Sequence, residues 1–252
     1  MKFKDKVVLV TGGGSGLGRA MCLLFAREGA AVIVHYSKSK ERAIEVVDRI
    51  DAMGGQAAAI QADVSRDSQA RQLIEKAVAR FGRLDVLINN AGWTRFIPHS
   101  ELAELSEEVL ENTWSVTVKA PIYCTRAAVP HLKKNGAGSV INITSSAAYT
   151  AMGSSVIYCA AKAALASITK SLARALAPEI RVNAIAPGFV DTGFVNWSPE
   201  VLEHLKRKTR LGRAVVSEDI AEAAVYLAAD AHSTTGQTIL VDGGVVALGP
   251  NA

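Results

Sequence analysis

The sequence is poor in cysteine and has no sustained apolar run. Of its 252 residues only three are cysteines, Cys22, Cys124 and Cys159. An odd number of widely spaced cysteines, each in an apolar stretch, predicts buried free thiols in a reducing compartment rather than a disulfide framework or a metal site. No uncharged apolar run approaches 18 residues, and only four apolar residues, Val7–Val10, follow the charged N-terminus. We therefore expect no membrane span, no secretory signal peptide and a cytoplasmic location.

Charge of one sign is not in large excess either. Lysine and arginine number 28 against 24 acidic residues, a net charge of +4, and the one tight basic group is Lys206–Arg210. A nucleic-acid binder usually clusters its basic residues, so we expect no nucleic-acid partner. Apolar residues make up 49% of the chain and charged residues 21%. These are ordinary globular values and exclude a mostly disordered chain.

Short β-branched runs alternate along the chain with longer helical patterns. Strands are expected at Lys6–Thr11, Val32–Val34, Ala57–Ala62, Leu84–Asn89, Ser139–Thr144, Ile180–Ala186 and Thr238–Val241. Helices are expected at Gly16–Glu28, Ser39–Met53, Arg66–Phe81, about Ser100 to Lys134, Ser154–Leu176 and Asp219–Ala229. This alternation predicts βαβ units, and strands that are almost wholly apolar predict a sheet covered on both faces. With no linker to divide it, the chain is predicted to be a single α/β domain over residues 1–252, a doubly wound parallel sheet of about seven strands.

A glycine-rich turn, Thr11–Gly18, follows the first strand and precedes a helix. Such glycines let the backbone approach a pyrophosphate, and the helix N-terminus offers it free N–H groups and positive dipole. The pattern Gly12-x-x-x-Gly16-x-Gly18 is not a literal G-x-G-x-x-G, and no Gly-Lys-Ser/Thr follows it, which excludes a nucleoside-triphosphate loop. The turn predicts a dinucleotide site, against the plainer alternative of a tight turn alone.

The choice of cofactor is expected to depend on the end of the second strand, at His35–Lys40. That segment has no carboxylate for a free ribose 2′-hydroxyl, but it has two serines and two lysines, which suit a 2′-phosphate. It predicts NADP in preference to NAD, with NAD still possible. The alternative is that both lysines are solvated residues at a helix start.

Tyr158 and Lys162 stand four residues apart, so on a helix they share one face. A nearby ammonium stabilises a phenolate, which predicts a lowered tyrosine pKa and a usable acid or base near neutrality. Ser145 ends the fifth predicted strand, and Asn89–Gly92 ends the fourth. Because parallel strands present their carboxyl ends at one edge, we expect these groups to converge.

Two further motifs, Arg181–Gly188 and Val241–Gly244, lie near the end of the chain. With these motifs and the earlier ones, the chain resembles the short-chain dehydrogenase/reductase family over nearly its whole length. Within that family it is similar to 3-oxoacyl-[acyl-carrier-protein] reductases. The resemblance implies a Rossmann-type fold and an NAD(P)-dependent oxidoreductase. It implies that Tyr158 exchanges the substrate proton, Lys162 holds the nicotinamide ribose, and Ser145 binds the substrate oxygen. The cofactor contacts that it implies are Gly12, Ser15, Gly16, Leu17, Gly18, Tyr36, Ser37, Lys38, Asp63, Val64, Asn89, Ala91, Gly92, Tyr158, Lys162, Pro187, Gly188, Val190 and Thr192.

One position departs from the family pattern. Where the family usually has an asparagine that holds a relay water for the lysine, this chain has Thr117. Asn112 is five residues away, about 140° around a helix, and is a poor substitute. The relay would then use Thr117, Ser115 or backbone carbonyls, or Thr117 would simply bond the preceding turn. A weakly active or non-catalytic NAD(P)-binding sensor or structural homologue is therefore the second function class.

The substrate pocket is expected in the loops after the fourth, fifth and sixth strands. Its predicted lining is Trp93, Phe96, Ala147, Met152, Phe189, Phe194 and Trp197. Apolar walls with one hydrogen-bonding corner suit a ketone or secondary alcohol, and a short substrate loop at about 189–212 favours one of small to medium size. The resemblance adds an acyl-carrier protein as a partner to consider. The helical stretches 100–134 and 154–176 are apolar on more than one face. The resemblance implies that these two helices pair across one twofold axis and that the C-terminal strand forms a second interface, so we expect a homotetramer.

Overall fold

The computed structural model describes residues 1–134, 136–190, 192, 198, 200, 203–204 and 207–250. Within this part of the chain a parallel sheet of seven strands has the order β3-β2-β1-β4-β5-β6-β7. The strands are β1 (Val7–Val10), β2 (Ala31–Tyr36), β3 (Gln56–Gln61), β4 (Val86–Asn89), β5 (Gly138–Ile143), β6 (Ile180–Pro187) and β7 (Thr238–Val241). The predicted doubly wound Rossmann-type sheet is confirmed, and its order reverses between β1 and β4, where such folds bind ligands.

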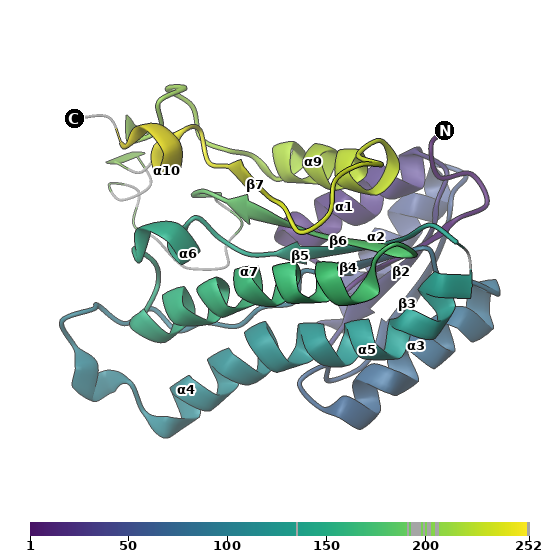
Figure 1. Cartoon of the computed structure of the whole chain (residues 1–252), viewed down its shortest axis with the longest axis horizontal. Helices are drawn as coiled ribbons and strands as arrows, with labels where there is room; N and C mark the ends of the chain where they lie inside the picture. Colours follow the sequence, from purple (N-terminus) through teal and green to yellow (C-terminus); the bar gives the residue numbers. More distant parts are fainter. Residues whose placement is uncertain are drawn as a thin grey trace.

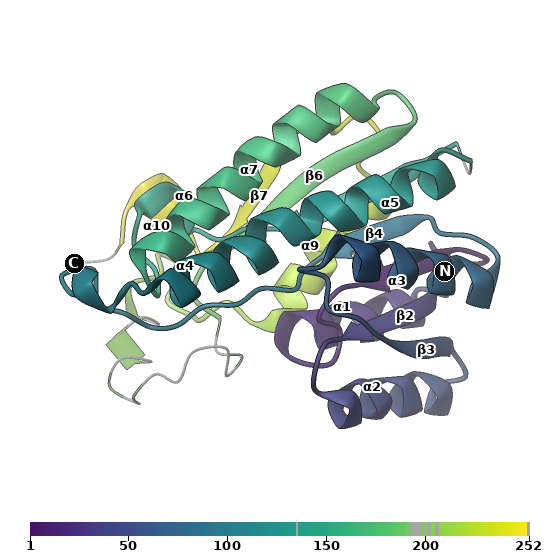
Figure 2. The ribbon, with the colours of Figure 1, turned by 90° about the horizontal axis from the view of Figure 1, so that it is seen from below.

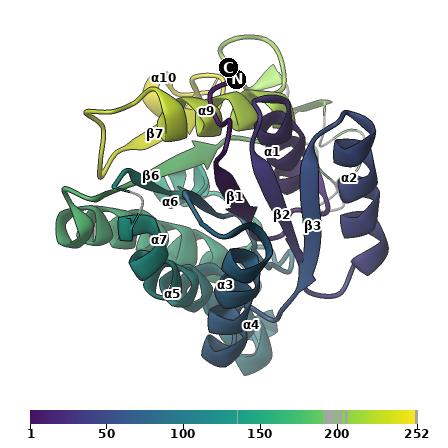
Figure 3. The ribbon, with the colours of Figure 1, turned by 90° about the vertical axis from the view of Figure 1, so that its right-hand side faces the viewer.

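Helices cover both faces of the sheet (Figure 1). One face carries α1 (Gly16–Arg27), α2 (Lys40–Ala52) and α9 (Ser217–Ala229), and the other carries α3 (Asp67–Phe81), α5 (Ala120–Lys134) and α7 (Val156–Leu176). Figure 3 shows the two helical layers on either side of the strands. Along β1, Val8 and Val10 join the first core while Val7 and Leu9 join the second. Alternate residues of each strand thus face opposite layers, which explains why the strands are apolar throughout.

The helical stretch expected from about Ser100 to Lys134 is not one helix. It contains a 3₁₀ turn at Leu102–Glu104, α4 at Glu107–Trp114, a π-helical turn at Ser115–Lys119, and then α5. The amide of Ala120 donates to the carbonyl of Ser115, five residues back, which places one extra residue in the turn. Figure 2 shows α4 and α5 continuing in nearly one direction beside α7. Two short helices that we did not expect, α6 (Ala147–Thr150) and α10 (Val245–Leu248), follow β5 and β7.

Among the residues that the structure describes, one helix, α7, is long and apolar enough to cross a membrane by length and composition alone. It instead packs against β5, β6 and α4 as a core helix of the α/β domain. Its buried residues include the charged Lys162 and the polar Thr169, and Asn142 of β5 donates a hydrogen bond to the Thr169 hydroxyl. This helix therefore brings polar groups to the sheet.

The register of the central strands brings the predicted motifs to one edge. Val10 of β1 pairs with Ile88 of β4, and Asn89 pairs with Asn142 of β5. The glycine-rich turn, the Asn89–Gly92 segment and Ser145 therefore all follow the carboxyl ends of three adjacent strands. This edge contains the candidate site.

Candidate active site

The glycine-rich turn forms a cradle at the start of α1. Gly12 and Gly16 have φ angles of +65° and +49°, which favour glycine. A Cβ on Gly18 would lie 2.1 Å from the Gly12 carbonyl oxygen, so a side chain there is excluded. The first turn of α1 has no acidic residue, and the hydroxyl of Ser15 at its N-cap makes no capping hydrogen bond. Free N–H groups, positive dipole and no competing charge fit the pyrophosphate of a dinucleotide.

Three residues that the sequence reasoning left unassigned hold this turn in place. The Thr11 hydroxyl accepts hydrogen bonds from the amides of Asn90 (2.9 Å) and Ala91 (3.0 Å). The Asn90 side chain donates back to the Thr11 carbonyl at 2.9 Å. The Gly12 amide donates to Nδ1 of His35 at 3.0 Å. Thr11 and Asn90 belong to the two motifs already singled out, whereas His35 carries no motif signal.

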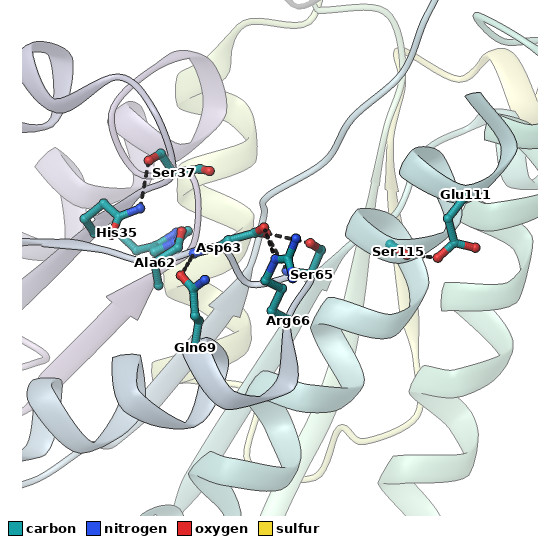
Figure 4. A network of polar contacts seen from close by, with 10 residues as sticks. His35, Ser37, Ala62, Asp63, Ser65, Arg66, Gln69, Glu111 and Ser115 are labelled. Carbon is teal, nitrogen blue, oxygen red and sulfur yellow. Dashed lines mark hydrogen bonds and ion pairs between the residues drawn. The ribbon is translucent and has the colours of Figure 1, made fainter. Parts of the chain in front are cut away.

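The segments expected near the adenine and its ribose flank the cradle. Ser37 and Lys38 follow β2 and are exposed, and the Ser37 carbonyl accepts from Gln61 at 3.1 Å. The Asp63 carboxylate accepts hydrogen bonds from Ser65 at 2.6 Å and from Arg66 at 3.3 Å (Figure 4). Partial burial opposes ionisation of Asp63, but these hydrogen bonds and the Arg66 charge outweigh it and lower the pKa of the carboxyl.

Other expected cofactor contacts lie in two different environments. The Asn89 side chain is 3% exposed and donates inside the sheet to Asn142 (2.8 Å) and Thr125 (3.2 Å), so it is already occupied. Thr192 covers the start of α1, because a Cβ on Gly16 would meet the Thr192 side chain at 3.0 Å. Pro187 is the last residue of β6. The Gly188 amide donates a hydrogen bond to the carbonyl of Val241 in β7, and Val190 forms an isolated β-bridge with Val215.

Ser145 and Tyr158 meet across the loop between β5 and α7. Ser145 lies just beyond β5 and just before α6, and Tyr158 is in the first turn of α7. Ser155 caps α7 by accepting a hydrogen bond from the Tyr158 amide at 3.3 Å. The side chains of Tyr158 and Ser145 share a hydrogen bond. The Ser145 hydroxyl also accepts a hydrogen bond from the Ala147 amide at 3.2 Å. The convergence expected from the sequence is therefore present in the fold.

The predicted lowering of the tyrosine pKa is wrong for this structure. Burial raises the pKa of Tyr158 to about 12, and the hydrogen bond with Ser145 opposes that rise only in part. The Lys162 ammonium donates to the Ile143 carbonyl at 2.7 Å and lies 5.6 Å from the centroid of the Tyr158 ring. Burial lowers the pKa of Lys162 to about 8. Spacing on a helix shows that two groups share a face, but not how much water each one loses.

Thr117 occupies the middle of the π-helical turn and is fully buried. Its hydroxyl has no hydrogen-bond partner in the part of the chain that the structure describes. The alternative in which Thr117 bonds the preceding turn is therefore wrong, and it is Thr113 that does so, donating to Val109 at 2.7 Å. The Ser115 hydroxyl is occupied by Glu111 at 2.5 Å on the exposed side (Figure 4).

The residues expected to line the substrate pocket are only partly brought together. Trp93 and Phe96 lie in a loop that is fastened to the segment before Tyr158. The Thr94 and Ser154 hydroxyls are 2.6 Å apart, and the Ile97 amide donates to the Ser154 carbonyl at 2.7 Å. Ala147 is buried and Phe189 half-buried, whereas Phe96 and Met152 are 52% and 66% exposed. Phe194 and Trp197, in the loop 189–212, lie outside the described residues. Among the described residues no three His, Cys, Asp or Glu side chains could hold a metal ion.

A dinucleotide cradle beside a Ser–Tyr–Lys group defines the class of nicotinamide-dependent oxidoreductases. Comparison with known proteins agrees, since the family described as enoyl-(acyl carrier protein) reductase matches residues 12–246. The chain belongs to this family of short-chain dehydrogenases/reductases, and among its relatives it is similar to 3-oxoacyl-[acyl-carrier-protein] reductases.

The relatives match along almost the whole chain. The 3-oxoacyl-[acyl-carrier-protein] reductase FabG of Thermotoga maritima is 37% identical over 249 residues, 98% of this chain and 100% of that protein. Tropinone reductase-like 3 of Erythroxylum coca is 36% identical over 248 residues, 96% of this chain and 94% of that protein. A dehydrogenase/reductase from Sinorhizobium meliloti superposes with a TM-score of 0.90 at 35% identity, covering 97% of this chain and 96% of that one. A short-chain dehydrogenase from Burkholderia cenocepacia in complex with NADP gives 0.89 at 33% identity, covering 96% and 98%.

Proposed function

We propose that this protein transfers a hydride between NADP(H) and a ketone or secondary alcohol of small to medium size. The observation that carries the proposal is the hydrogen bond between Tyr158 and Ser145, with the buried Lys162 directly beside the tyrosine ring. This group lies at the same sheet edge as the pyrophosphate cradle at Gly12–Gly18. The proposed sites for a carbonyl oxygen and for a dinucleotide would therefore be adjacent.

Each protein group has a defined part in carbonyl reduction. The bound dinucleotide would supply the hydride to the carbonyl carbon. The Ser145 hydroxyl would donate a hydrogen bond to the carbonyl oxygen, and Tyr158 would transfer its phenolic proton to that oxygen as negative charge develops. A pKa of about 12 keeps Tyr158 protonated at neutral pH, which suits a donor. Lys162 remains cationic below its pKa of about 8, so it would stabilise the tyrosinate that the transfer leaves.

NADP is the proposed cofactor, with NAD as the competing one. Ser37 and Lys38 after β2 and Lys40 at the start of α2 are all exposed, and no carboxylate stands among them. Hydroxyl and ammonium donors suit a 2′-phosphate, whereas a carboxylate would suit a free 2′-hydroxyl. The solved relative that carries NADP supports the same choice.

The substrate class is proposed from the walls of the site and from the relatives. The loop bearing Trp93 and Phe96 is fastened to Ser154, four residues before Tyr158, which supports an apolar wall on this side of the proposed proton donor. Among carbonyl compounds, a 3-oxoacyl thioester held by an acyl-carrier protein is the first candidate, because several relatives bear that activity in their names. A free small ketone is the second.

We also propose a cytoplasmic homotetramer. Leu110 and Trp114 of α4 and Val156 of α7 expose apolar surface on helices that pack against each other. Leu248 exposes a second apolar surface at the C-terminal end. Two separate apolar surfaces suit two twofold axes, as in a D₂ tetramer, and three buried free thiols suit a reducing compartment. Light scattering at micromolar concentration should give a mass well above that of a monomer. A measured mass of 26.6 kDa, that of a single chain, would contradict this assembly.

The replacement Tyr158→Phe tests the proposed chemistry. It removes the phenolic proton while keeping the ring, so ketone-dependent NADPH oxidation should fall by roughly 10²–10⁴-fold or more. NADPH binding, measured by fluorescence, should persist. Tyr149→Phe is the matched control, because Tyr149 lies on the exposed side of α6 and should be replaceable without loss. Full turnover in Tyr158→Phe would remove the assignment, and a wild type that binds NADPH but reduces no ketone would favour the non-catalytic homologue.

A further inference from the structure

His35 is a fully buried polar side chain that the proposed chemistry does not use. It lies on β2, opposite Ile60 of β3, with 1% of its surface exposed. Its Nδ1 is 3.0 Å from the amide nitrogen of Gly12, and its Nε2 is 3.0 Å from the carbonyl oxygen of Ala62. One imidazole thus connects the phosphate turn to the chain after β3.

The two partners fix the protonation state of this imidazole. The Gly12 amide can only donate, so Nδ1 must accept, and the Ala62 carbonyl can only accept, so Nε2 must carry the proton. The neutral Nε2–H tautomer satisfies both, whereas an imidazolium would set two N–H groups against each other at Gly12. Burial also lowers the pKa of His35, to about 4.

Both segments that His35 joins belong to the proposed cofactor site. On one side, the His35 carbonyl accepts a hydrogen bond from the Gly13 amide at 2.9 Å. The side chain and the backbone of His35 together therefore hold the first two glycines of the turn. On the other, Ala62 immediately precedes Asp63, and the Asp63 amide donates to Gln69 at 2.7 Å (Figure 4). The Ala62 amide in turn bonds the Tyr36 carbonyl at 3.1 Å.

We propose that His35 is a positioning residue that sets the distance between the pyrophosphate cradle and the adenine-side segment, and so determines the affinity for the dinucleotide. The inference rests on the proposed cofactor site. Without the imidazole, the half-buried Gly12 amide would lose its acceptor, at a residue whose positive φ already makes the turn. The turn would then shift to find water, away from the position that suits a pyrophosphate.

Two substitutions separate the two hydrogen bonds. In His35→Asn the side-chain oxygen stands where Nδ1 was and can still accept from Gly12, but nothing reaches Ala62. In His35→Gln the terminal amide stands where Nε2 was and can still donate to Ala62, but Gly12 loses its acceptor. Each variant therefore loses one of the two hydrogen bonds, and only His35→Gln frees the phosphate turn.

NADPH binding should distinguish the variants. By fluorescence titration, we expect His35→Gln to raise the Kd for NADPH about tenfold, because the half-buried Gly12 amide loses its acceptor, and His35→Asn to stay within about threefold of the wild type. The ketone KM and kcat at saturating NADPH should change little in either variant. His232→Gln, at an exposed histidine, is the control and should match the wild type. Equal losses of affinity in the Asn and Gln variants, in step with their thermal stabilities, would make His35 merely structural and overturn the inference.

If His35→Gln does not fold, a measurement on the wild-type protein tests the same inference. In ¹⁵N-histidine NMR the resonance that disappears in His35→Asn should show the neutral Nε2–H tautomer at pH 7, and its Nδ1 signal should shift when NADPH is added. An Nδ1–H tautomer, or a signal unmoved by saturating NADPH, would overturn the inference. A wild type that binds no dinucleotide at all would instead remove the proposed function, and this inference with it.

Discussion

The Lys162 ammonium donates a hydrogen bond to the backbone carbonyl of Ile143, 2.7 Å away. Ile143 is the last residue of β5, two positions before Ser145, and Lys162 is one turn beyond Tyr158 on α7. The bond therefore fastens the face of α7 that carries Tyr158 to the strand that precedes Ser145. It is made by a charge that burial disfavours, since the pKa of Lys162 falls from 10.5 to about 8.

Lys162→Met should make the protein more stable and less active. At pH 7 the buried charge costs about 3 kcal/mol by the depression of its pKa, and loss of the Ile143 bond offsets part of this. We expect a net gain of about 1–2 kcal/mol in the free energy of unfolding, measured in urea, and a loss of turnover of about 100-fold or more. The gain should shrink as pH rises from 8 toward 10.5, because the wild-type lysine then loses its charge while folded. A destabilised variant at pH 7 would show that the hydrogen bond outweighs the desolvation.

Gly18→Ala should abolish dinucleotide binding, although alanine is the better helix former by about 1 kcal/mol. The added Cβ would lie 2.1 Å from the Gly12 carbonyl oxygen and 2.7 Å from the side-chain nitrogen Nδ2 of Asn90. Neither can yield without moving the turn, so the Kd for NADPH should rise at least about tenfold. Gly54→Ala is the control, because a Cβ there meets nothing within 4 Å and only the backbone cost of its φ of +75° is felt. Unchanged NADPH binding in Gly18→Ala would argue against a pyrophosphate at this turn.

Replacing Lys38 and Lys40 together with alanine should weaken NADP binding selectively. Loss of charged hydrogen-bond donors to the 2′-phosphate is expected to cost roughly 1–3 kcal/mol of binding free energy, while NAD affinity should barely change. Parallel titrations with the two dinucleotides measure the difference. Tighter binding of NAD than of NADP by the wild type would contradict the proposed preference.

The sheet and the main motifs could be predicted from local pattern. Each predicted strand falls within about two residues of its observed bounds, because apolar runs and glycine stops are local signals. The π-helical turn at Ser115–Lys119 could not be predicted from the sequence. Such a turn differs from an α-helix by one residue and leaves the spacing of apolar residues almost intact. The helices α6 and α10 have four residues each, too few for a periodic signal.

In the candidate site, residue identity was predictable but electrostatic environment was not. The convergence of Ser145 with Tyr158 follows from strand ends and helix spacing. The raised pKa of Tyr158 depends on how deeply the fold buries it, which no spacing records. His35 begins the segment expected to choose the cofactor, but its own contacts could not be predicted, because its two partners are backbone groups of Gly12 and Ala62 that only the fold brings together.

Acidification should destabilise the protein in a window set by His35. Its pKa is about 4 in the folded chain and 6.5 when unfolded, because burial penalises the charged form. Between these values the unfolded chain binds a proton that the folded chain does not, so stability present above pH 6.5 is lost as pH falls toward 4, by up to about 3 kcal/mol. Urea unfolding of the wild type and His35→Asn across this range isolates the effect. The variant should show a shallower dependence, and identical slopes would contradict the burial of a neutral imidazole.

Thr117 should influence proton supply without being needed for the hydride step. Its hydroxyl is buried and unpartnered in the described structure, and the neighbouring Ser115 hydroxyl is occupied by Glu111. An unpaired buried hydroxyl costs free energy unless a water meets it, and such a water is what a relay from Lys162 requires. Thr117→Val keeps the branched shape and removes the hydroxyl, so it separates packing from the polar role.

Two results together would establish that role. In Thr117→Val we expect unchanged or slightly higher stability, by up to about 1 kcal/mol, with lower turnover and a shifted pH profile. Thr117→Asn should be tolerated, and should raise turnover if proton transfer limits the rate, because an amide offers the water more hydrogen bonds. The solvent isotope effect on kcat should be larger in Thr117→Val than in Thr117→Asn. If Thr117→Val leaves turnover, pH profile and isotope effect as in the wild type, the hydroxyl takes no part, and proton supply to Tyr158 must use backbone carbonyls near Lys162 instead.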